Sequence, residues 1–176
     1  MLAESALAIM QKRAVYVEDL KPGFLAKRLN WLFAMHSSLS SVYSVEAALK
    51  EIGTFRFLLA TFLGILGKII HRSGDFYRFA GRTVATIDDC SGTMPPYDKF
   101  VVLGPKNSWE IVKEIKAKTA LEAAVVDAND LGKVDVLAAS SPKIIALLQK
   151  ALASNPQGNA NEQTPLVLIK PDEITL

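Results

Sequence analysis

The stretch Phe100–Val126, FVVLGPKNSWEIVKEIKAKTALEAAVV, decides the fold class of this chain. Its apolar ends predict β-strands at 100–103 and 121–126. Between them, Asn107 and Glu110 have the spacing of a capping box, with Asn in place of the usual Ser or Thr, and apolar residues then recur at helical spacing. A strand–helix–strand unit of this length is typical of a crossover between parallel strands. The sequence therefore predicts a mixed α/β fold with at least one parallel strand pair.

The chain beyond this unit continues the alternation of predicted strands and helices. The apolar run 134–138 predicts another strand, and Ser141-Pro142 predicts the start of a helix that ends near residue 153. A polar loop then leads to a predicted strand at 166–169. We expect a central mixed sheet with flanking helices, of the α/β or mixed α+β class.

The first part of the chain is richer in predicted helix. Helical periodicity predicts helices at 22–35, 45–52 and 55–70, so that a helical part spans about 20–72 and an α/β part about 73–170 of a single domain, residues 1–176. Two other segments favour strands. The run 7–17 predicts two strands or a hairpin, and 76–87 predicts strands bent at Gly81.

The predicted strand at Ala6–Met10 begins almost at the first residue. A first strand with so little sequence before it is what we expect of an N-terminally shortened relative of a longer protein. The N-terminus also has Glu4 where a secretory signal would place positive charge, so no export signal is predicted.

The segment 52–70 is the only candidate for a membrane span. Arg56 and Lys68 interrupt it, and the uncharged run between them is far shorter than the roughly 20 residues that a span needs. We therefore predict no membrane span, and a helix over 57–66 that is largely covered by protein. Gly64 and Gly67 give this helix a small-residue face that a neighbouring element could approach closely.

The composition excludes several classes of protein. The chain has 176 residues, of which half are hydrophobic, which is enough apolar material for a folded core. Its 20 Lys and Arg against 18 Asp and Glu give a net charge of +2, so no broad basic field is available for nucleic acid. One cysteine and two histidines exclude an intramolecular disulfide and a Cys/His zinc site, and we expect a reducing, cytoplasmic location.

Acidic residues follow two of the predicted strands. Asp88 and Asp89 lie in one such loop, and Asp127, Asn129 and Asp130 lie in the other. Mg²⁺ and Mn²⁺ prefer carboxylate oxygens, so these two loops, brought side by side, would hold one or two ions against phosphates. The alternative is that these side chains form Asx-turns and helix caps, which Asp and Asn at strand ends do more often.

Four further residues, Lys106, Lys133, Glu162 and Thr164, are candidates for nucleotide contacts. Lys106 and Lys133 would meet phosphates as point charges, although most lysines are only solvated. The loop Glu162–Pro165, which includes Thr164, could reach a ligand or form a plain turn. Cys90 lies beside two acidic residues, which disfavour its thiolate, so it is not proposed as a nucleophile.

Six ordered motifs resemble those of the γ-glutamyl ligase-like family named after coenzyme F-420:L-glutamate ligase, and the resemblance covers about residues 4–171. It is closest to the divergent, ligase-like branch of that family. The motifs are GDFYRFAG at 74–81, IDD at 87–89, PPYD at 95–98, VLGPK at 102–106, VDANDLG at 126–132 and NANEQTP at 159–165.

The resemblance implies a mixed α/β homodimer that forms an amide bond with GTP or ATP and a divalent metal. A substrate carboxylate would attack the γ-phosphate, and the amine of an amino acid such as L-glutamate would then displace phosphate. The family's first metal aspartate matches Asp88, with Asp89 beside it. Its second metal loop matches through Gly132, which places Asn129 at an aspartate and Lys133 at an arginine of the family pattern.

These departures leave two interpretations open. Asn is a weaker metal ligand than a carboxylate, Lys lacks the bidentate fork of Arg, and the family's early lysine falls on Ser5. They favour a non-catalytic ligase-like binding or assembly module. The acidic loops and the Glu162–Pro165 segment favour a metal-dependent ligase, with Asp127 or Asp130 compensating for Asn129.

Overall fold

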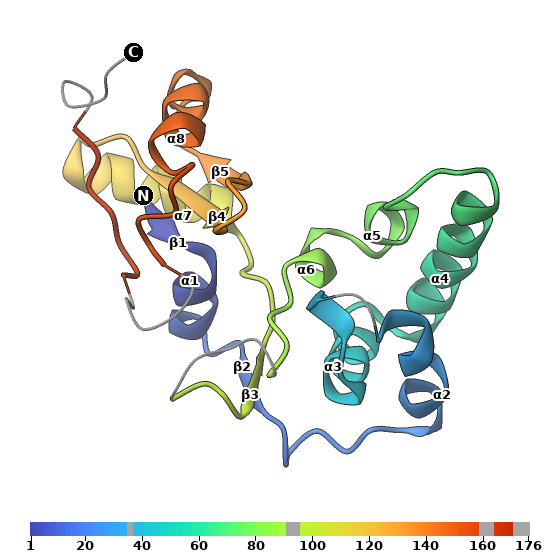
Figure 1. The fold of residues 1–176 in the computed structure, drawn as a ribbon. Coiled ribbons are helices and arrows are strands. Elements are labelled where there is room, and N and C mark those ends of the chain that lie inside the picture. The colour runs from blue at the N-terminus through green and yellow to red at the C-terminus, as the bar shows by residue number, and fades with distance from the viewer. Residues whose placement is uncertain (35–36, 91–95, 159–163, 171–176) are drawn as a thin grey trace. The chain divides into compact units, whose positions relative to one another are not determined.

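A computed structural model describes residues 1–34, 37–90, 96–158 and 164–170 of the chain. The chain divides into two compact units. Met1–Gln11 and Pro105–Leu176 form one, here called the sheet unit, and Lys12–Gly104 form the other, the helical unit (Figure 1). The content is mixed α/β, as predicted.

The sheet unit is built on three strands with helices on both faces. The strands lie in the order β1-β4-β5, with β1 parallel to β4 and β4 antiparallel to β5. The elements are β1 (Leu2–Ala3), α1 (Glu4–Met10), α7 (Ser108–Thr119), β4 (Ala124–Ala128), β5 (Val134–Ala139), the 3-10 turn η2 (Pro142–Ile144) and α8 (Ile145–Ala151).

Successive side chains of β4 point to opposite faces of the sheet, and this divides the core of the sheet unit into two layers. Val125 packs with Leu7 of α1 and Val112 of α7, whereas Val126 packs with Leu148 of α8 on the opposite face. The segment after residue 164 extends the sheet beyond β1, because the Ala3 N–H donates to the Pro165 carbonyl at 2.9 Å.

The helical unit packs short helices around one apolar core and carries a small antiparallel sheet. Its elements are β2 (Ala14–Tyr16), α2 (Phe24–Phe33), the 3-10 turn η1 (Ser37–Leu39), α3 (Val42–Ile52), α4 (Thr54–Ile69), α5 (Asp75–Ala80), α6 (Arg82–Ala85) and β3 (Phe100–Val102). Strand β2 pairs antiparallel with β3, and Asp88 forms a further antiparallel bridge to Val102.

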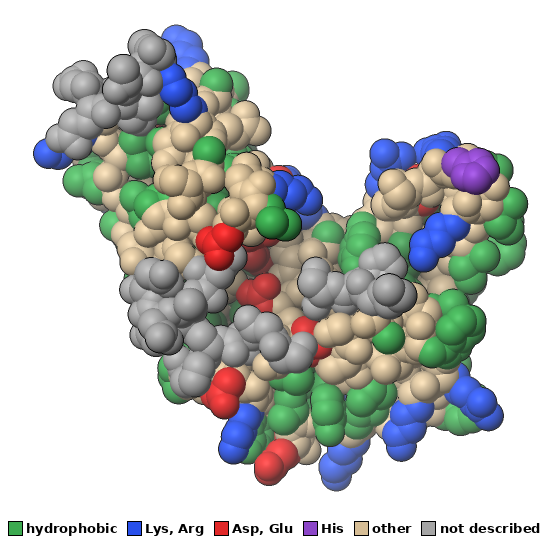
Figure 2. Space-filling model, viewed as in Figure 1, with side chains coloured by type: hydrophobic (Ala, Val, Ile, Leu, Met, Phe, Trp, Pro, Cys, Tyr) green, Lys and Arg blue, Asp and Glu red, His purple; other side chains and the backbone are tan. Residues whose placement is uncertain are grey.

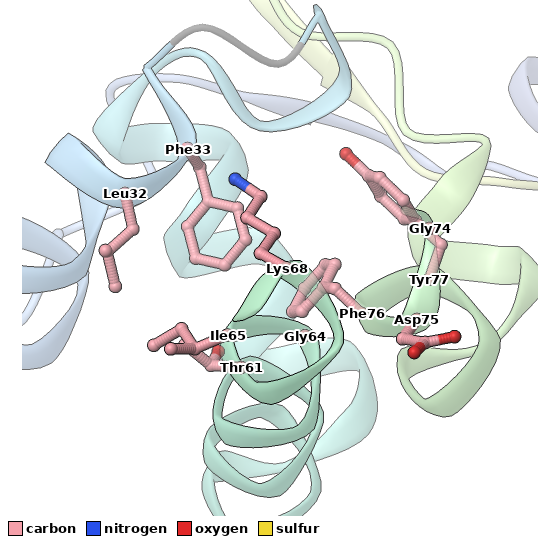
Figure 3. A pocket seen from close by; sticks show the side chains of 10 residues that line it. All are labelled: Leu32, Phe33, Thr61, Gly64, Ile65, Lys68, Gly74, Asp75, Phe76 and Tyr77. Carbon is pink, nitrogen blue, oxygen red and sulfur yellow. The ribbon is translucent and has the colours of Figure 1, made fainter. Parts of the chain in front are cut away.

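Three aromatic rings hold the helices of this unit together. The ring centroids of Phe33 (α2), Phe57 (α4) and Phe76 (α5) lie 4.7 to 5.6 Å apart. Figure 3 shows Phe33 and Phe76 at the side of a small pocket beside α4, which Ile65 and Lys68 also line. The predicted small-residue face of α4 is confirmed, because a Cβ at Gly64 would lie 2.9 Å from the Cβ of Phe76.

Two strand predictions are wrong because the segments are helical. Residues 6–10 belong to α1, and 76–87 contain α5 and α6. Gly74, with φ of 83°, begins α5, and Gly81, with φ of 101°, ends α5 and begins α6; glycine adopts such positive φ values without strain. The last predicted strand, 166–169, is reduced to a bridge between Leu166 and Leu2.

The prediction that the strands before and after α7 pair in parallel is also wrong. β3 belongs to the helical unit and β4 to the sheet unit, so the two strands that flank α7 do not pair with each other. The parallel partner of β4 is β1, with Leu2 beside Val125. Helix α7 forms as predicted, but the Asn107 side chain makes no cap hydrogen bond.

The prediction that residues 57–66 are largely covered by protein is wrong. Phe57, Ala60 and Thr61 are buried, but most of the other large apolar side chains in this range are exposed, including Phe62 at 58%. In the part of the chain that the structure describes, no single helix is long and apolar enough to cross a membrane. Helices α3 and α4 pass that test only as a pair, bent by 115°.

Candidate functional site

The carboxyl ends of β1 and β4 meet at one edge of the sheet unit. Ala3 lies beside Val126 in the parallel register, and Asp127 follows directly on β4. β5 runs back along β4 from the same edge and places Asp135 opposite Asp127. Because residues directly opposite on antiparallel strands point to the same face, these two carboxylates share one side of the sheet. Sequence reasoning missed Asp135, whose signal was a charged residue inside an apolar strand.

The electrostatics of this pair favour a cation. Although Asp127 is exposed, the surrounding protein atoms raise the pKa of its carboxyl, and the negative charge of Asp135 raises it further. Lys133 acts in the opposite direction and lowers this pKa. A divalent ion would relieve the repulsion between the two carboxylates, and hard oxygen donors are what Mg²⁺ and Mn²⁺ prefer.

Asn129 uses its side-chain oxygen inside the β4–β5 hairpin. Asn129 Oδ1 accepts the backbone N–H of Leu131 at 3.0 Å and that of Lys133 at 3.1 Å. Gly132, with φ of 73°, completes the reversal. This is the Asx-turn arrangement that was the alternative to metal binding.

Asp130 lies in the same hairpin turn and also has an internal partner. Its carboxylate accepts the Asn155 side-chain amide at 2.7 Å. Asn155 is buried and has φ of 47°, and it follows α8. Asp130 thereby ties the hairpin to the chain that leaves α8.

The other predicted metal loop belongs to the helical unit. The backbone of Asp88 exchanges two hydrogen bonds with Val102, at 2.8 and 2.9 Å. Asp89 is buried, and its carboxylate accepts the hydroxyl of Ser40 and, at 2.5 Å, that of Ser41. Ser41 also caps α3 by accepting the Ser44 N–H at 3.1 Å, so Asp89 anchors the start of that helix.

Cys90 is not activated as a nucleophile. Burial raises the pKa of its thiol, and the charge of Asp89 raises it further. The sequence predicted the second of these two causes.

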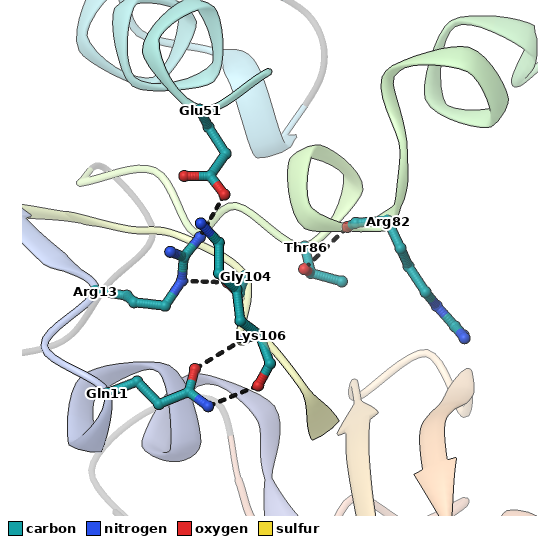
Figure 4. A network of polar contacts seen from close by, with 7 residues as sticks. All are labelled: Gln11, Arg13, Glu51, Arg82, Thr86, Gly104 and Lys106. Carbon is teal, nitrogen blue, oxygen red and sulfur yellow. Dashed lines mark hydrogen bonds and ion pairs between the residues drawn. The ribbon is translucent and has the colours of Figure 1, made fainter. Parts of the chain in front are cut away.

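Lys106 lies just after the chain returns to the sheet unit. Its backbone is paired with the side chain of Gln11, which donates to the Lys106 carbonyl at 2.7 Å and accepts its N–H at 2.8 Å (Figure 4). Thr164 is half-buried beside the segment that extends the sheet. Glu162 lies outside the described residues.

Among the described residues, no group of three or more His, Cys, Asp or Glu side chains lies close enough together to hold a metal ion by itself. The predicted ligands are instead divided between the two units. Asp127, Asn129 and Asp130 lie in the sheet unit, and Asp88 and Asp89 lie in the helical unit. No protein-family model, no curated protein and no solved structure matches the chain.

Proposed function

We propose that this protein is a nucleotide- and metal-dependent ligase that forms an amide bond between a carboxylate substrate and an amino acid such as L-glutamate. The observation that carries the proposal is the opposed pair Asp127 and Asp135 at the carboxyl ends of β1 and β4. The carboxyl edge of parallel strands is where α/β proteins bind their ligands. The resemblance of six sequence motifs to the γ-glutamyl ligase-like family supports the same reaction class.

Two carboxylates are sufficient for the metal that this reaction uses. Mg²⁺ is usually held by one or two carboxylates and completed by water and substrate phosphates. Asp127 and Asp135 would hold Mg²⁺ or Mn²⁺, which would neutralise charge on the phosphates of GTP or ATP. Lys133, on the same hairpin, would contact a phosphate oxygen as a point charge. Asp88 stays a predicted ligand, whereas Asp89, Asn129 and Asp130 mainly support the fold.

Calorimetry of nucleotide binding tests the proposal. The folded full chain should bind GTP or ATP more tightly with Mn²⁺ or Mg²⁺ than with a chelator. Asp127→Asn and Asp135→Asn should each reduce the metal-dependent increase in nucleotide affinity at least about tenfold. Even the outer-shell partners of a bound metal contribute that much to its affinity. Glu110→Gln, an exposed acid of the same unit, should leave the increment unchanged. Binding that is the same with metal and with chelator would contradict the proposal.

A second candidate function is a non-catalytic ligase-like binding or assembly module. The observation that favours it is that the side-chain oxygens of Asp89, Asn129 and Asp130 accept hydrogen bonds from the fold itself. In that case the carboxylate pair would tune the stability of the hairpin, and neither nucleotide would bind in a metal-dependent way. The same calorimetry separates the two candidates.

A further inference from the structure

A small pocket lies between α2, α4 and α5 of the helical unit, with a volume of about 80 Å³. Apolar side chains from all three helices form most of its wall: Leu32, Phe33, Ile65 and Phe76 (Figure 3). Ile65 and Gly74 are exposed, so the pocket opens to solvent beside them. An apolar cavity of about 150 Å³ holds benzene. This smaller pocket therefore has room for an aliphatic chain of about four carbons and not for an aromatic ring.

Lys68 is the only cation among the described residues that line this pocket. In the view of Figure 3 its side chain lies between the rings of Phe33 and Phe76. A lysine can pack its carbon stem against apolar surface in this way while its ammonium group stays in water. Within the part of the chain that the structure describes, this ammonium group makes no ion pair and no hydrogen bond. The pocket thus combines an apolar interior with one unpaired positive charge.

Two other polar side chains of the pocket have partners within the fold. The Thr61 hydroxyl donates to the Phe57 carbonyl at 2.8 Å. The Asp75 carboxylate accepts the guanidinium groups of Arg72 and Arg78, at 3.3 and 3.1 Å, so two positive charges face this one negative charge. Figure 2 shows Lys and Arg side chains near the end of α4 that leads to α5. The charge around the pocket is therefore positive on balance, and it favours an anionic ligand.

We propose that this pocket binds a short aliphatic carboxylate. The aliphatic chain lies against Phe33, Ile65 and Phe76, and its removal from water drives the binding. The ammonium group of Lys68 donates a charge-assisted hydrogen bond to the carboxylate, which fixes the end of the ligand that enters the pocket. The site lies entirely within the helical unit. It is separate from the proposed ligase reaction, which rests on the carboxylate pair of the sheet unit.

An NMR titration of the full chain with butyrate tests the proposal. Binding should saturate with a Kd on the order of 1 mM, as expected of a ligand with about six non-hydrogen atoms. The backbone amides of Gly64 and Gly74, which line the pocket, should shift, whereas that of Gly132 in the sheet unit should not. Nuclear Overhauser effects from the butyrate methyl protons to the ring protons of Phe33 or Phe76 should place the aliphatic chain inside the pocket.

Matched ligands and variants test the charge and the aliphatic chain separately. Butylammonium, which has the opposite charge, and acetate, which lacks the chain, should each bind at least about tenfold more weakly than butyrate. Lys68→Gln should weaken butyrate binding about tenfold, because a hydrogen bond from a charged group is lost, and Lys68→Arg should keep the affinity within about threefold. Both variants should keep the unfolding midpoint of the wild type, because Lys68 is exposed. Lys143→Gln, on the sheet unit, is the matched control and should leave the Kd unchanged.

Three results would overturn the proposal. The first is a titration that does not saturate at butyrate concentrations about tenfold above the expected Kd. The second is butyrate binding that Lys68→Gln leaves unchanged, or that butylammonium equals, since either would show that the ammonium group does not select the ligand. The third is a set of shifts and Overhauser effects that leaves out the residues lining the pocket, which would place the butyrate elsewhere.

Discussion

Gly67 of α4 lies so close to Asp75 of α5 that a Cβ at residue 67 would be 2.5 Å from Asp75 Oδ2 and 3.1 Å from its Cγ. The carboxylate cannot move away freely, because it is buried and its other oxygen accepts Arg72 and Arg78. The absence of a side chain at Gly67 is therefore what lets α5 pack against α4 with a buried acid between them.

Gly67→Ala should destabilise the protein by roughly 1 kcal/mol. Overpacking costs about 1–3 kcal/mol, and the better helix propensity of Ala returns up to about 1 kcal/mol. The free energy of unfolding in urea measures this. In an Asp75→Ala background the same substitution should be close to neutral, and an equal loss in both backgrounds would show that the contact with Asp75 is not the cause.

Gly104→Ala should cost more than Gly67→Ala, about 2–3 kcal/mol. A Cβ at residue 104 would be 2.0 Å from Thr86 Oγ1 and 3.0 Å from the Thr83 carbonyl oxygen. Figure 4 shows Thr86 beside Gly104, whose own carbonyl accepts Arg13 Nε at 2.6 Å. Adding Thr86→Ala should recover only part of the loss in unfolding free energy, because the clash with the Thr83 backbone remains. Full recovery would contradict this explanation.

Asp127→Asn should stabilise the folded state at neutral pH by less than about 1 kcal/mol, because solvent screens this exposed carboxylate. The folded-state pKa of Asp127 is raised above its ordinary value of 3.8. Its ionised form therefore destabilises the fold at pH above that raised pKa, and the cost disappears as the pH falls below 3.8. Urea unfolding of variant and wild type across this range measures the difference. If Asp127→Asn still stabilised the protein at pH below 3.8, the ionised carboxylate would not be the cause of the difference.

The titration of Asp127 can also be followed directly by carbon-detected NMR. Asp135→Asn should lower the pKa of Asp127 only part of the way toward the ordinary value, since the surrounding protein atoms raise this pKa more than the charge of Asp135 does. Lys133→Gln should raise it further. A pKa that neither substitution moves would exclude coupling across the β4–β5 pair.

Asp89→Ala should cost about 2–3 kcal/mol in unfolding free energy, because it removes charge-assisted hydrogen bonds from Ser40 and Ser41 at the start of α3. Asp98→Ala, at an exposed position, should change little. Because Asp89 acts inside the fold, millimolar Mg²⁺ should stabilise the wild type and the Asp89 variant equally. A Mg²⁺-dependent difference between the two would restore Asp89 to the metal site.

The elements with clear periodicity could be predicted from the sequence, and those decided by distant contacts could not. The helix at 108–119 and the strand at 134–139 form where their apolar patterns indicate. The strand predicted at 6–10 is a helix, and its Ala, Leu and Met residues are in fact strong helix formers. Its neighbour β1 has only two residues, so no sequence pattern could have indicated the parallel pairing with β4.

The sequence pointed to the hairpin that carries the candidate site, but it did not identify every residue of the site. The acidic hairpin after β4 was found from its residues, and so was the alternative that Asn129 forms an Asx-turn. Asp135 was missed because its relation to Asp127 depends on the strand register, which includes an irregularity between Val125 and Val126. The covering of α4 was mispredicted because a short apolar helix has the same pattern whether both of its sides are packed or one is exposed.

The helical unit is inserted between two segments of the sheet unit, and this has a consequence for the order of folding. β1 cannot form its parallel pair until β4 has been synthesised, about 120 residues later. If the helical unit folds first, Leu103 N–H reaches the Arg13 carbonyl at 3.0 Å, and the loop that β1 and β4 must close shrinks to roughly a quarter of its length. At about 0.6 kcal/mol for each doubling of loop length, this lowers the entropic barrier by about 1 kcal/mol. Early folding of the inserted unit thus speeds the later pairing of the two ends of the chain.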